Sequence, residues 1–320
     1  MKLSRREFIK TAGAFMAGGI MGAEKLLGIL RGGKVNSSSG SMPVRELGKT
    51  GHKVSIFSLG GEAAVESSLN PGRAEDIINR GIDLGVNYID TAPLYGRTAS
   101  ETNIGRVMKE RRKEVFLATK TAERSYSGTM RSVEESLRRL STDRIDLYQL
   151  HSIRTEGDLR RVFASDGAVK ALDELKEAGV IGYTGITGHY DPGTLIKGIE
   201  SYGFDCILMT LNAGDPHYRP FQEELLEKAV QKEMGIIAMK VTARGRIFRE
   251  EGITSMEEAL GYALSFPVST AIVGISGIGE LEENVRIARE FKPFSDEELE
   301  RLSGLTRSYS QEANFFKHRW

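Results

Sequence analysis

Four side chains of the kinds used in proton transfer occur in the first half of the sequence: Asp90, Tyr95, Lys120 and His151. Asp90 ends a short apolar run with β-branched residues, which is typical of a buried strand, and Tyr95 follows in a loop. A strand-end carboxylate and a phenol five residues later can reach one pocket. Taken alone, the pair equally fits an aspartate that caps a turn and a half-buried aromatic.

The other two residues end similar apolar runs. At its strand end Lys120 is expected to be buried and to pair with Asp90. Because a positive neighbour lowers a phenol's pKa from about 10, the sequence predicts that Lys120 lets Tyr95 donate a proton nearer neutrality. His151 is expected to hold a substrate oxygen or to share the proton. A lone strand-end histidine is more often structural, so the chemical interpretation depends on finding all four together.

The elements that must position these residues alternate regularly. Apolar runs that fit strands cover 58–60, 87–90, 115–119, 146–150, 182–186, 205–210, 236–239 and 270–273. Helical patterns cover 74–84, 100–110, 129–139, 168–178, 192–201, 220–232, 256–266 and 280–290. This order predicts an α/β fold, a (β/α)8 TIM barrel with an N-terminal β-hairpin over 44–57 and a C-terminal helix or tail. A doubly wound sheet ranks second, because no Gly-x-Gly-x-x-Gly follows the first strand.

A TIM barrel carries its site at the carboxyl ends of its strands. Polar residues recur at those ends in this sequence: Asp90, Lys120, His151, Thr187, Asn212 and Lys240.

Composition excludes several classes of function. The 320 residues carry no net charge, so there is no electrostatic reason to expect nucleic acid or an anionic membrane as partner. The single cysteine, Cys206, excludes an intrachain disulfide and a thiolate metal cluster. Because no Asp or Glu stands at zinc-motif spacing from His189 or His217, no metal is predicted.

The first forty residues have the layout of an export signal. Arg5, Arg6 and Phe8 precede a Gly/Ala-rich apolar stretch over 11–23, and this pattern resembles a twin-arginine (Tat) signal, which directs export of folded proteins. We therefore predict a signal peptide and flexible linker over 1–40, a barrel domain over 41–320, the twin-arginine export machinery as partner, and a periplasmic or other extracytoplasmic location. A frayed basic terminus is the alternative, and an uncleaved signal would tether the protein to the membrane.

Between residues 45 and 284 the sequence also resembles the aldo-keto reductase family. The matching motifs are Arg-Glu-Leu-Gly-Lys-Thr-Gly from 45, Asn-Tyr-Ile-Asp-Thr-Ala-Pro-Leu-Tyr-Gly from 87, Thr-Lys from 119, Asp-Leu-Tyr-Gln-Leu-His from 146, and Ile-Val-Gly from 272 with Glu-Asn from 283. The resemblance implies NAD(P)(H) as cofactor, no metal, and a small-molecule carbonyl or alcohol as substrate. It makes Tyr95 the general acid, tuned by Lys120 and Asp90, while His151 orients the carbonyl.

The chain departs from the family around the nicotinamide. Where the family commonly reads Gly-Val-Ser-Asn-Phe, residues 185–189 read Gly-Ile-Thr-Gly-His. Thr187 keeps a hydroxyl for the nicotinamide amide, but Gly188 cannot replace the usual Asn. Leu208 stands for the usual Gln and Met239 for the usual stacking Tyr. The candidates to compensate are Asn212, His189 and Lys240.

The glycine-rich segment 274–279 follows the last strand and opens a helix, where backbone N–H groups can bind phosphate. The expected cofactor-binding residues here are Gly274, Ser276, Gly277, Glu280 and Asn284. In the family an Arg near this helix start commonly meets the 2′-phosphate of NADP, and counting places Glu280 there. This favours NAD, although Ser276 and Arg286 would allow phosphate binding. A plain glycine-rich turn is the alternative.

Two functions from different classes fit these residues. One is an exported, NAD(P)(H)-dependent oxidoreductase that interconverts a carbonyl and an alcohol by hydride transfer, and the four proton-transfer residues favour it. The other is a non-catalytic, nucleotide-binding barrel that acts as sensor or subunit, which the altered amide contacts favour. A barrel hydrolase or isomerase is disfavoured, because no second carboxylate stands opposite Asp90.

The aromatic tail over 309–320 either covers the substrate mouth or only packs on the barrel.

Overall fold

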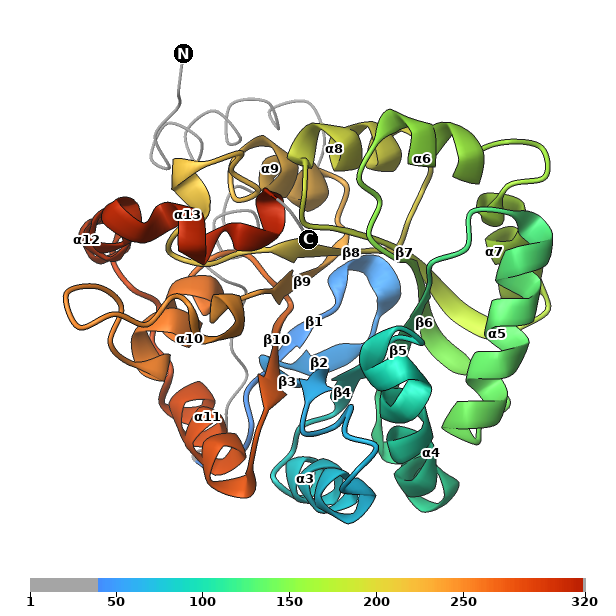
Figure 1. The fold of residues 1–320 in the computed structure, drawn as a ribbon, viewed down its shortest axis with the longest axis horizontal. Coiled ribbons are helices and arrows are strands. Elements are labelled where there is room, and N and C mark those ends of the chain that lie inside the picture. The colour runs from blue at the N-terminus through green and yellow to red at the C-terminus, as the bar shows by residue number, and fades with distance from the viewer. Residues whose placement is uncertain (1–39, 319–320) are drawn as a thin grey trace.

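A closed barrel of parallel strands forms the centre of the protein (Figure 1). The structure is a computed structural model that describes residues 40–318. The order of the strands around the barrel is β10-β3-β4-β5-β6-β7-β8-β9. Their bounds are β3 Phe57–Ala63, β4 Tyr88–Asp90, β5 Phe116–Thr121, β6 Ile145–Leu150, β7 Ile181–Gly188, β8 Cys206–Thr210, β9 Gly235–Met239 and β10 Thr270–Ile275. The predicted TIM barrel is confirmed, with each strand at its predicted place.

Helices surround the barrel on all sides (Figure 1). Those at predicted places are α3 Pro71–Asp83, α4 Ala99–Arg111, α5 Tyr126–Leu140, α7 Ala168–Glu177, α8 Pro192–Ser201, α9 Glu224–Gln231, α10 Met256–Leu264 and α11 Ile278–Glu290. The structure adds α6 Glu156–Val162, and its C-terminal part forms α12 Asp296–Thr306 and α13 Ser310–Ala313. The start predicted for α9 at residue 220 was too early. The N–H groups of Phe221 and Gln222 donate to the buried Asp215 carboxylate at 2.8 and 2.9 Å, which holds this segment in a turn.

The predicted β-hairpin is present as β1 (Val44–Glu46) and β2 (Lys53–Ser55), which pair antiparallel. Leu47 and Val54 from the hairpin pack in one buried cluster with residues that fill the barrel, such as Tyr88 and Leu147. The backbone N–H of Lys49 also donates to the carbonyl before β9, at Glu233, at 2.9 Å. The hairpin therefore closes the amino-terminal end of the barrel and leaves the other end open for a site.

The barrel interior changes from apolar to polar along the strands. Because successive side chains of a strand alternate between its two faces, positions two apart point the same way. Tyr88, Ala118 and Leu147 lie in the apolar interior cluster, and two residues further along their strands stand Asp90, Lys120 and Gln149, all completely buried. Three polar side chains therefore form one layer above the apolar core, at the carboxyl ends of neighbouring strands.

The C-terminal segment packs on loops at this same end. The fully buried Lys317 ammonium pairs with Asp215, in the loop after β8, and also donates to the Tyr218 carbonyl at 2.9 Å. The ring of His189, just after β7, lies 3.2 Å through Nδ1 from the Phe316 carbonyl oxygen. The tail thus lies on the rim formed by the loops after β7 and β8.

Two sequence predictions concern membranes and export. Among residues 40–318, no helix has the length and apolar character required to cross a membrane. The predicted twin-arginine signal and linker fall on residues 1–39, outside the described residues, so that assignment and the domain boundary stay predictions.

Candidate active site

The structure brings Asp90, Tyr95 and Lys120 into direct contact. The Lys120 ammonium donates to an Asp90 carboxylate oxygen, to the Thr91 carbonyl at 2.8 Å and to the Tyr95 hydroxyl at 3.3 Å. The side chains of Lys120 and Asp90 are each only 1% exposed. An ion pair this deeply buried is tolerated only when its charges are paired and hydrogen-bonded, and this pair is both.

Gln149, which the sequence analysis did not select, completes this pair. Its amide nitrogen donates to the second Asp90 oxygen at 3.0 Å. The neighbouring strand leaves room for it, because a Cβ at Gly185 would lie 2.9 Å from the Gln149 Cγ. A search for polar residues at inward positions of β6, rather than only at strand ends, would have found Gln149.

His151 lies beside Tyr95 as predicted from the strand ends. The two rings meet edge to face, with centroids 5.9 Å apart and planes at 87°. Among the described residues, Nδ1 of His151 is buried without a hydrogen-bond partner. The imidazole thus stands next to the phenol, and its buried Nδ1 is hydrogen-bonded to no other described residue.

The electrostatics of these groups differ from the sequence prediction. Burial raises the pKa of Tyr95 well above its usual value, and the charges of Asp90 and Glu62 raise it further. The predicted shift of the Tyr95 pKa toward neutrality was therefore wrong in direction, because burial and nearby negative charges raise it. Burial also raises the pKa of Asp90, against the opposing effect of Lys120. Burial, followed by the positive charge of Lys120, lowers the pKa of His151 well below its usual value. Tyr95 is thus protonated and His151 neutral near pH 7.

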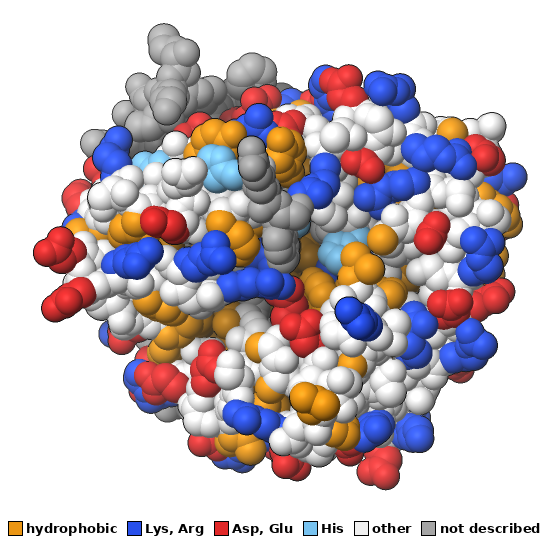
Figure 2. All heavy atoms as spheres, viewed as in Figure 1, with side chains coloured by type: hydrophobic (Ala, Val, Ile, Leu, Met, Phe, Trp, Pro, Cys, Tyr) orange, Lys and Arg blue, Asp and Glu red, His pale blue; other side chains and the backbone are white. Residues whose placement is uncertain are grey.

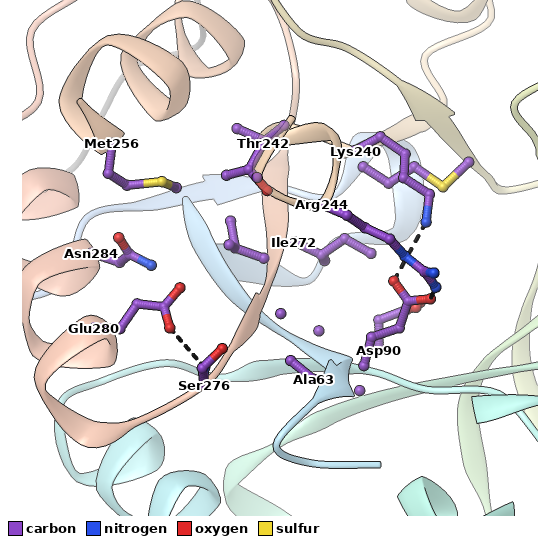
Figure 3. A pocket seen from close by; sticks show the side chains of 18 of the residues that line it. Ala63, Asp90, Lys240, Thr242, Arg244, Met256, Ile272, Ser276, Glu280 and Asn284 are labelled. Atoms are coloured by element: carbon purple, nitrogen blue, oxygen red, sulfur yellow. Dashed lines mark hydrogen bonds and ion pairs between the residues drawn. The ribbon is translucent and has the colours of Figure 1, made fainter. Parts of the chain in front are cut away.

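A cavity of about 600 Å³ begins at Tyr95 and Asp90 and extends to the first turns of α11 (Figure 3). This volume lies within the usual range for sites of small molecules and cofactors. The predicted cofactor residues that line it are Met239, Lys240, Gly274, Ser276, Glu280 and Asn284. Figure 3 shows Ser276, Glu280 and Asn284 together at one side, with Asp90, Lys240 and Arg244 at the other.

Glu62 and Arg244 are cavity residues that the sequence analysis missed. Arg244 donates to one Glu62 oxygen, and the Lys240 ammonium lies 3.4 Å from the other. The apolar run predicted the first barrel strand only as far as Gly60, but β3 continues to Ala63 and places Glu62 at a strand end, like Asp90. Arg244 follows β9 in a loop, where no local pattern marks it.

The pKa values of Glu62 and Lys240 are both lowered from their usual values. Burial alone would raise the pKa of Glu62, but Lys240 and Arg244 outweigh burial and lower it. Burial lowers the pKa of the Lys240 ammonium to about 8, and Glu62 offsets this only in part. Lys240 therefore loses its positive charge as the pH rises through about 8.

Asn212, Thr187 and Gly277 do not line the cavity. The Asn212 amide donates to the Lys240 carbonyl at 3.0 Å and accepts from the Gly214 N–H at 2.8 Å. Lys240 has a φ of 58°, a left-handed conformation that costs free energy unless its surroundings stabilise it. In this structure Asn212 thus positions Lys240. The Thr187 hydroxyl accepts from the Ser152 N–H at 2.8 Å.

The far end of the cavity presents polar groups suited to a nucleotide. The buried Nδ2 of Asn284 has no hydrogen-bond partner among the described residues, and Asn284 lines the cavity. The Glu280 carboxylate accepts from the Ser276 N–H at 2.7 Å. Within residues 40–318 there is no group of three or more His, Cys, Asp or Glu that could hold a metal ion.

Comparison with known proteins agrees with this geometry. The family model described as "Aldo/keto reductase family" matches residues 57–251, which is more than half of the chain. The chain belongs to the aldo/keto reductase family. Members of this family use NADPH or NADH, and the cavity's polar groups fit such a cofactor.

The chain is similar to relatives over most of its length. It is 28% identical to the uncharacterized oxidoreductase YqkF of Bacillus subtilis, covering 83% of this chain and 97% of that protein. It is 27% identical to L-galactose dehydrogenase of Arabidopsis thaliana, and the match covers 78% of this chain and 89% of that protein. The structure matches the holo form of aldo-keto reductase AKR11C1 from Bacillus halodurans with a TM-score of 0.70 at 28% identity. The match covers 82% of this chain and 95% of that protein.

The buried ion pair leads to a prediction about stability. Lys120→Met leaves the Asp90 carboxylate buried without its counter-charge, and breaking such a pair typically costs about 3–5 kcal/mol. We expect the free energy of unfolding to fall by that order, as measured by chemical denaturation. The double variant Asp90→Asn with Lys120→Met is expected to recover part of the loss, because it buries no unpaired charge. A single variant as stable as the wild type would contradict the role of the pair.

Proposed function

We propose that this protein is an NAD(P)(H)-dependent oxidoreductase that interconverts a carbonyl compound and an alcohol. The observation that carries the proposal is the contact between Lys120 and the Tyr95 hydroxyl at 3.3 Å, at the edge of a cavity suited to a nucleotide. Bound nicotinamide supplies or accepts the hydride. The residues of the chain itself donate or accept the proton.

Each residue of the site has a distinct role in this proton transfer. The raised pKa keeps Tyr95 protonated, so that its hydroxyl donates to the carbonyl oxygen during reduction. Lys120 then stabilises the negative charge on the Tyr95 oxygen, and Asp90 holds Lys120 in place. The neutral His151 has one N–H group, which donates to the same substrate oxygen and orients it.

The cofactor is held by residues along the cavity in this proposal. Met239 would lie against the nicotinamide, Lys240 would attract the phosphates, and Asn284 would donate through its Nδ2, which has no partner among the described residues. At the ribose end, the Glu280 carboxylate repels a 2′-phosphate and accepts a hydrogen bond from an unmodified hydroxyl. We therefore infer a preference for NAD(H), in contrast to a Klebsiella pneumoniae relative of the same fold, 21% identical, whose structure holds NADPH.

Titration of the apo-protein with NADH and NADPH tests this preference. We expect NADH to bind more tightly at pH 7, and Glu280→Ala to reduce the difference. Both affinities are expected to fall as the pH rises through about 8, because Lys240 then loses the charge that attracts the phosphates. Tighter binding of NADPH that is unchanged in Glu280→Ala would contradict the role of Glu280.

Replacement of the Tyr95 hydroxyl tests the reaction itself. We expect Tyr95→Phe to keep the fold and nucleotide binding but to lower the turnover of aldehydes by roughly 10²–10⁴-fold, because general acid catalysis contributes about that much. Oxidation of reduced nicotinamide, followed by absorbance, measures it. Near-normal turnover in the variant would exclude Tyr95. Nucleotide binding without turnover of any carbonyl compound in the wild type would instead support the non-catalytic sensor or subunit.

We further propose that the protein is exported folded, with its cofactor bound, through the twin-arginine machinery. The support is Arg5 and Arg6 ahead of a short apolar stretch. Since free nicotinamide is not regenerated outside the cytoplasm, the cofactor is expected to stay bound and to be recycled by paired substrates or an electron-transfer partner. Changing Arg5 and Arg6 to Lys should retain the protein in the cytoplasm, as judged by cell fractionation. A wild-type protein found in the cytoplasm would overturn the proposal.

A further inference from the structure

The open end of the barrel is divided into two halves. The residues that line the cavity come from β3, β4, β9, β10, the loops that follow them, and the adjoining helices α10 and α11. The loops after β6, β7 and β8 contribute no residue to that cavity. Tyr95 stands on the cavity side, and His151, which meets it edge to face, stands at the end of β6. A substrate that reaches both residues while the cofactor occupies the cavity therefore extends toward the half of the rim that the loops after β6, β7 and β8 form.

Arginine and aromatic side chains gather on these three loops. The Arg154 guanidinium lies 5.6 Å from the centroid of the Tyr190 ring. The Arg219 guanidinium lies 5.1 Å from the Tyr190 centroid and 5.4 Å from that of Tyr218. Tyr218 in turn stacks on His318 of the tail, with centroids 4.3 Å apart. These five residues are called the Arg219 cluster below, and Figure 2 shows basic side chains on this face between the central hollow and helices α6 and α8.

Three acidic residues on the same loops are engaged elsewhere. Asp158 pairs with Arg124 at 3.0 Å, the buried Asp215 pairs with Lys317, and Asp191 accepts from the Thr194 N–H at 2.9 Å.

Arg219 itself is exposed. Among residues 40–318 no carboxylate forms an ion pair with it. The structure therefore has a cation on this part of the rim that is held between aromatic rings rather than neutralised.

The charge of one cluster residue, Arg154, acts on His189, just after β7. His189 is the chain neighbour of Tyr190, and its pKa is lowered to about 4, first by burial and then by the charges of Lys240 and Arg154, while the Phe316 carbonyl and Glu62 oppose this. Both imidazoles near the site, His151 and His189, are thus neutral near pH 7, so the cation on this half of the rim that no carboxylate of residues 40–318 pairs is Arg219. An anionic group is attracted to this half, whereas a cationic one is repelled.

We propose that the preferred substrates are carbonyl compounds that carry a carboxylate, and that Arg219 is the specificity-determining residue that binds it. This proposal rests on the proposed function, because it names the substrate class of that site. A guanidinium matches the planar carboxylate with two parallel hydrogen bonds. The Tyr190 and Tyr218 rings restrict the Arg219 side chain, which lowers the entropy lost when the anion binds.

A matched pair of aldehydes tests the proposal in the full-length protein. Para-carboxybenzaldehyde carries the anion, and its methyl ester has nearly the same shape without the charge. We expect kcat/KM for the acid to exceed that for the ester by at least about tenfold, the effect of a charge-assisted hydrogen bond. Arg219→Gln should remove most of this ratio by raising KM for the acid, and added salt should reduce the ratio in the wild type. Arg219→Lys, which keeps the charge but not the planar fork, should give an intermediate ratio.

Arg106→Gln is the matched control, because Arg106 is an exposed arginine on the outer helix α4, paired with Glu75. It should leave the ratio of acid to ester at the wild-type value. Equal use of acid and ester, with no change in Arg219→Gln, would overturn the proposal while leaving the oxidoreductase function intact.

If no carbonyl compound is turned over, the proposed function fails, and calorimetric titration with para-carboxybenzaldehyde decides the anion site separately. Affinity about tenfold weaker in Arg219→Gln than in Arg106→Gln would support the site. Equal affinity would overturn it.

Discussion

The buried ion pair between Lys120 and Asp90 is the interaction on which the rest of the site depends. Two full charges that are each 1% exposed require a complete set of polar partners, because desolvation otherwise exceeds their mutual attraction. The Thr91 carbonyl and the Gln149 amide supply those partners. All of them stand at the carboxyl ends of β4, β5 and β6, so the closure of the barrel brings the pair together. The ammonium's contact with Tyr95 is then a consequence of where the pair must lie.

The molecule separates the parts that give stability from those that do chemistry. At the amino-terminal end of the barrel, Leu47 and Val54 from the hairpin extend the apolar core. At the carboxyl end, polar side chains and loops replace apolar ones, and every proposed functional residue lies there. This division lets loop residues such as Arg219, and strand-end residues such as Glu62, vary without disturbing the core, which is the usual way that one barrel fold supports different substrates.

The departures from the family pattern acquire a physical meaning in the structure. Asn212 is a candidate to replace the missing amide contact, but its side chain binds the Lys240 carbonyl and the Gly214 N–H. It thereby holds Lys240 in a left-handed conformation and fixes where that cation stands in the cavity. Of the altered positions, Met239 lines the cavity together with a group of charges, Glu62, Lys240 and Arg244, that the family motifs do not include. Leu208 instead lies in the apolar interior cluster.

Local patterns in the sequence were sufficient for the barrel, the hairpin, the strand ends and the residues Asp90, Tyr95, Lys120 and His151. Alternating and helical periodicities depend on neighbours a few residues apart, so they can be read without a structure. Other features depend on residues far apart in the chain. Gln149 donates to Asp90 across β5, Glu62 on β3 accepts from Arg244 after β9, and the turn before α9 forms on Asp215. The pKa of Tyr95 was predicted with the wrong sign for the same reason. This pKa depends on burial and on the charges of residues far apart in the chain, and only the closed barrel brings them together around Tyr95.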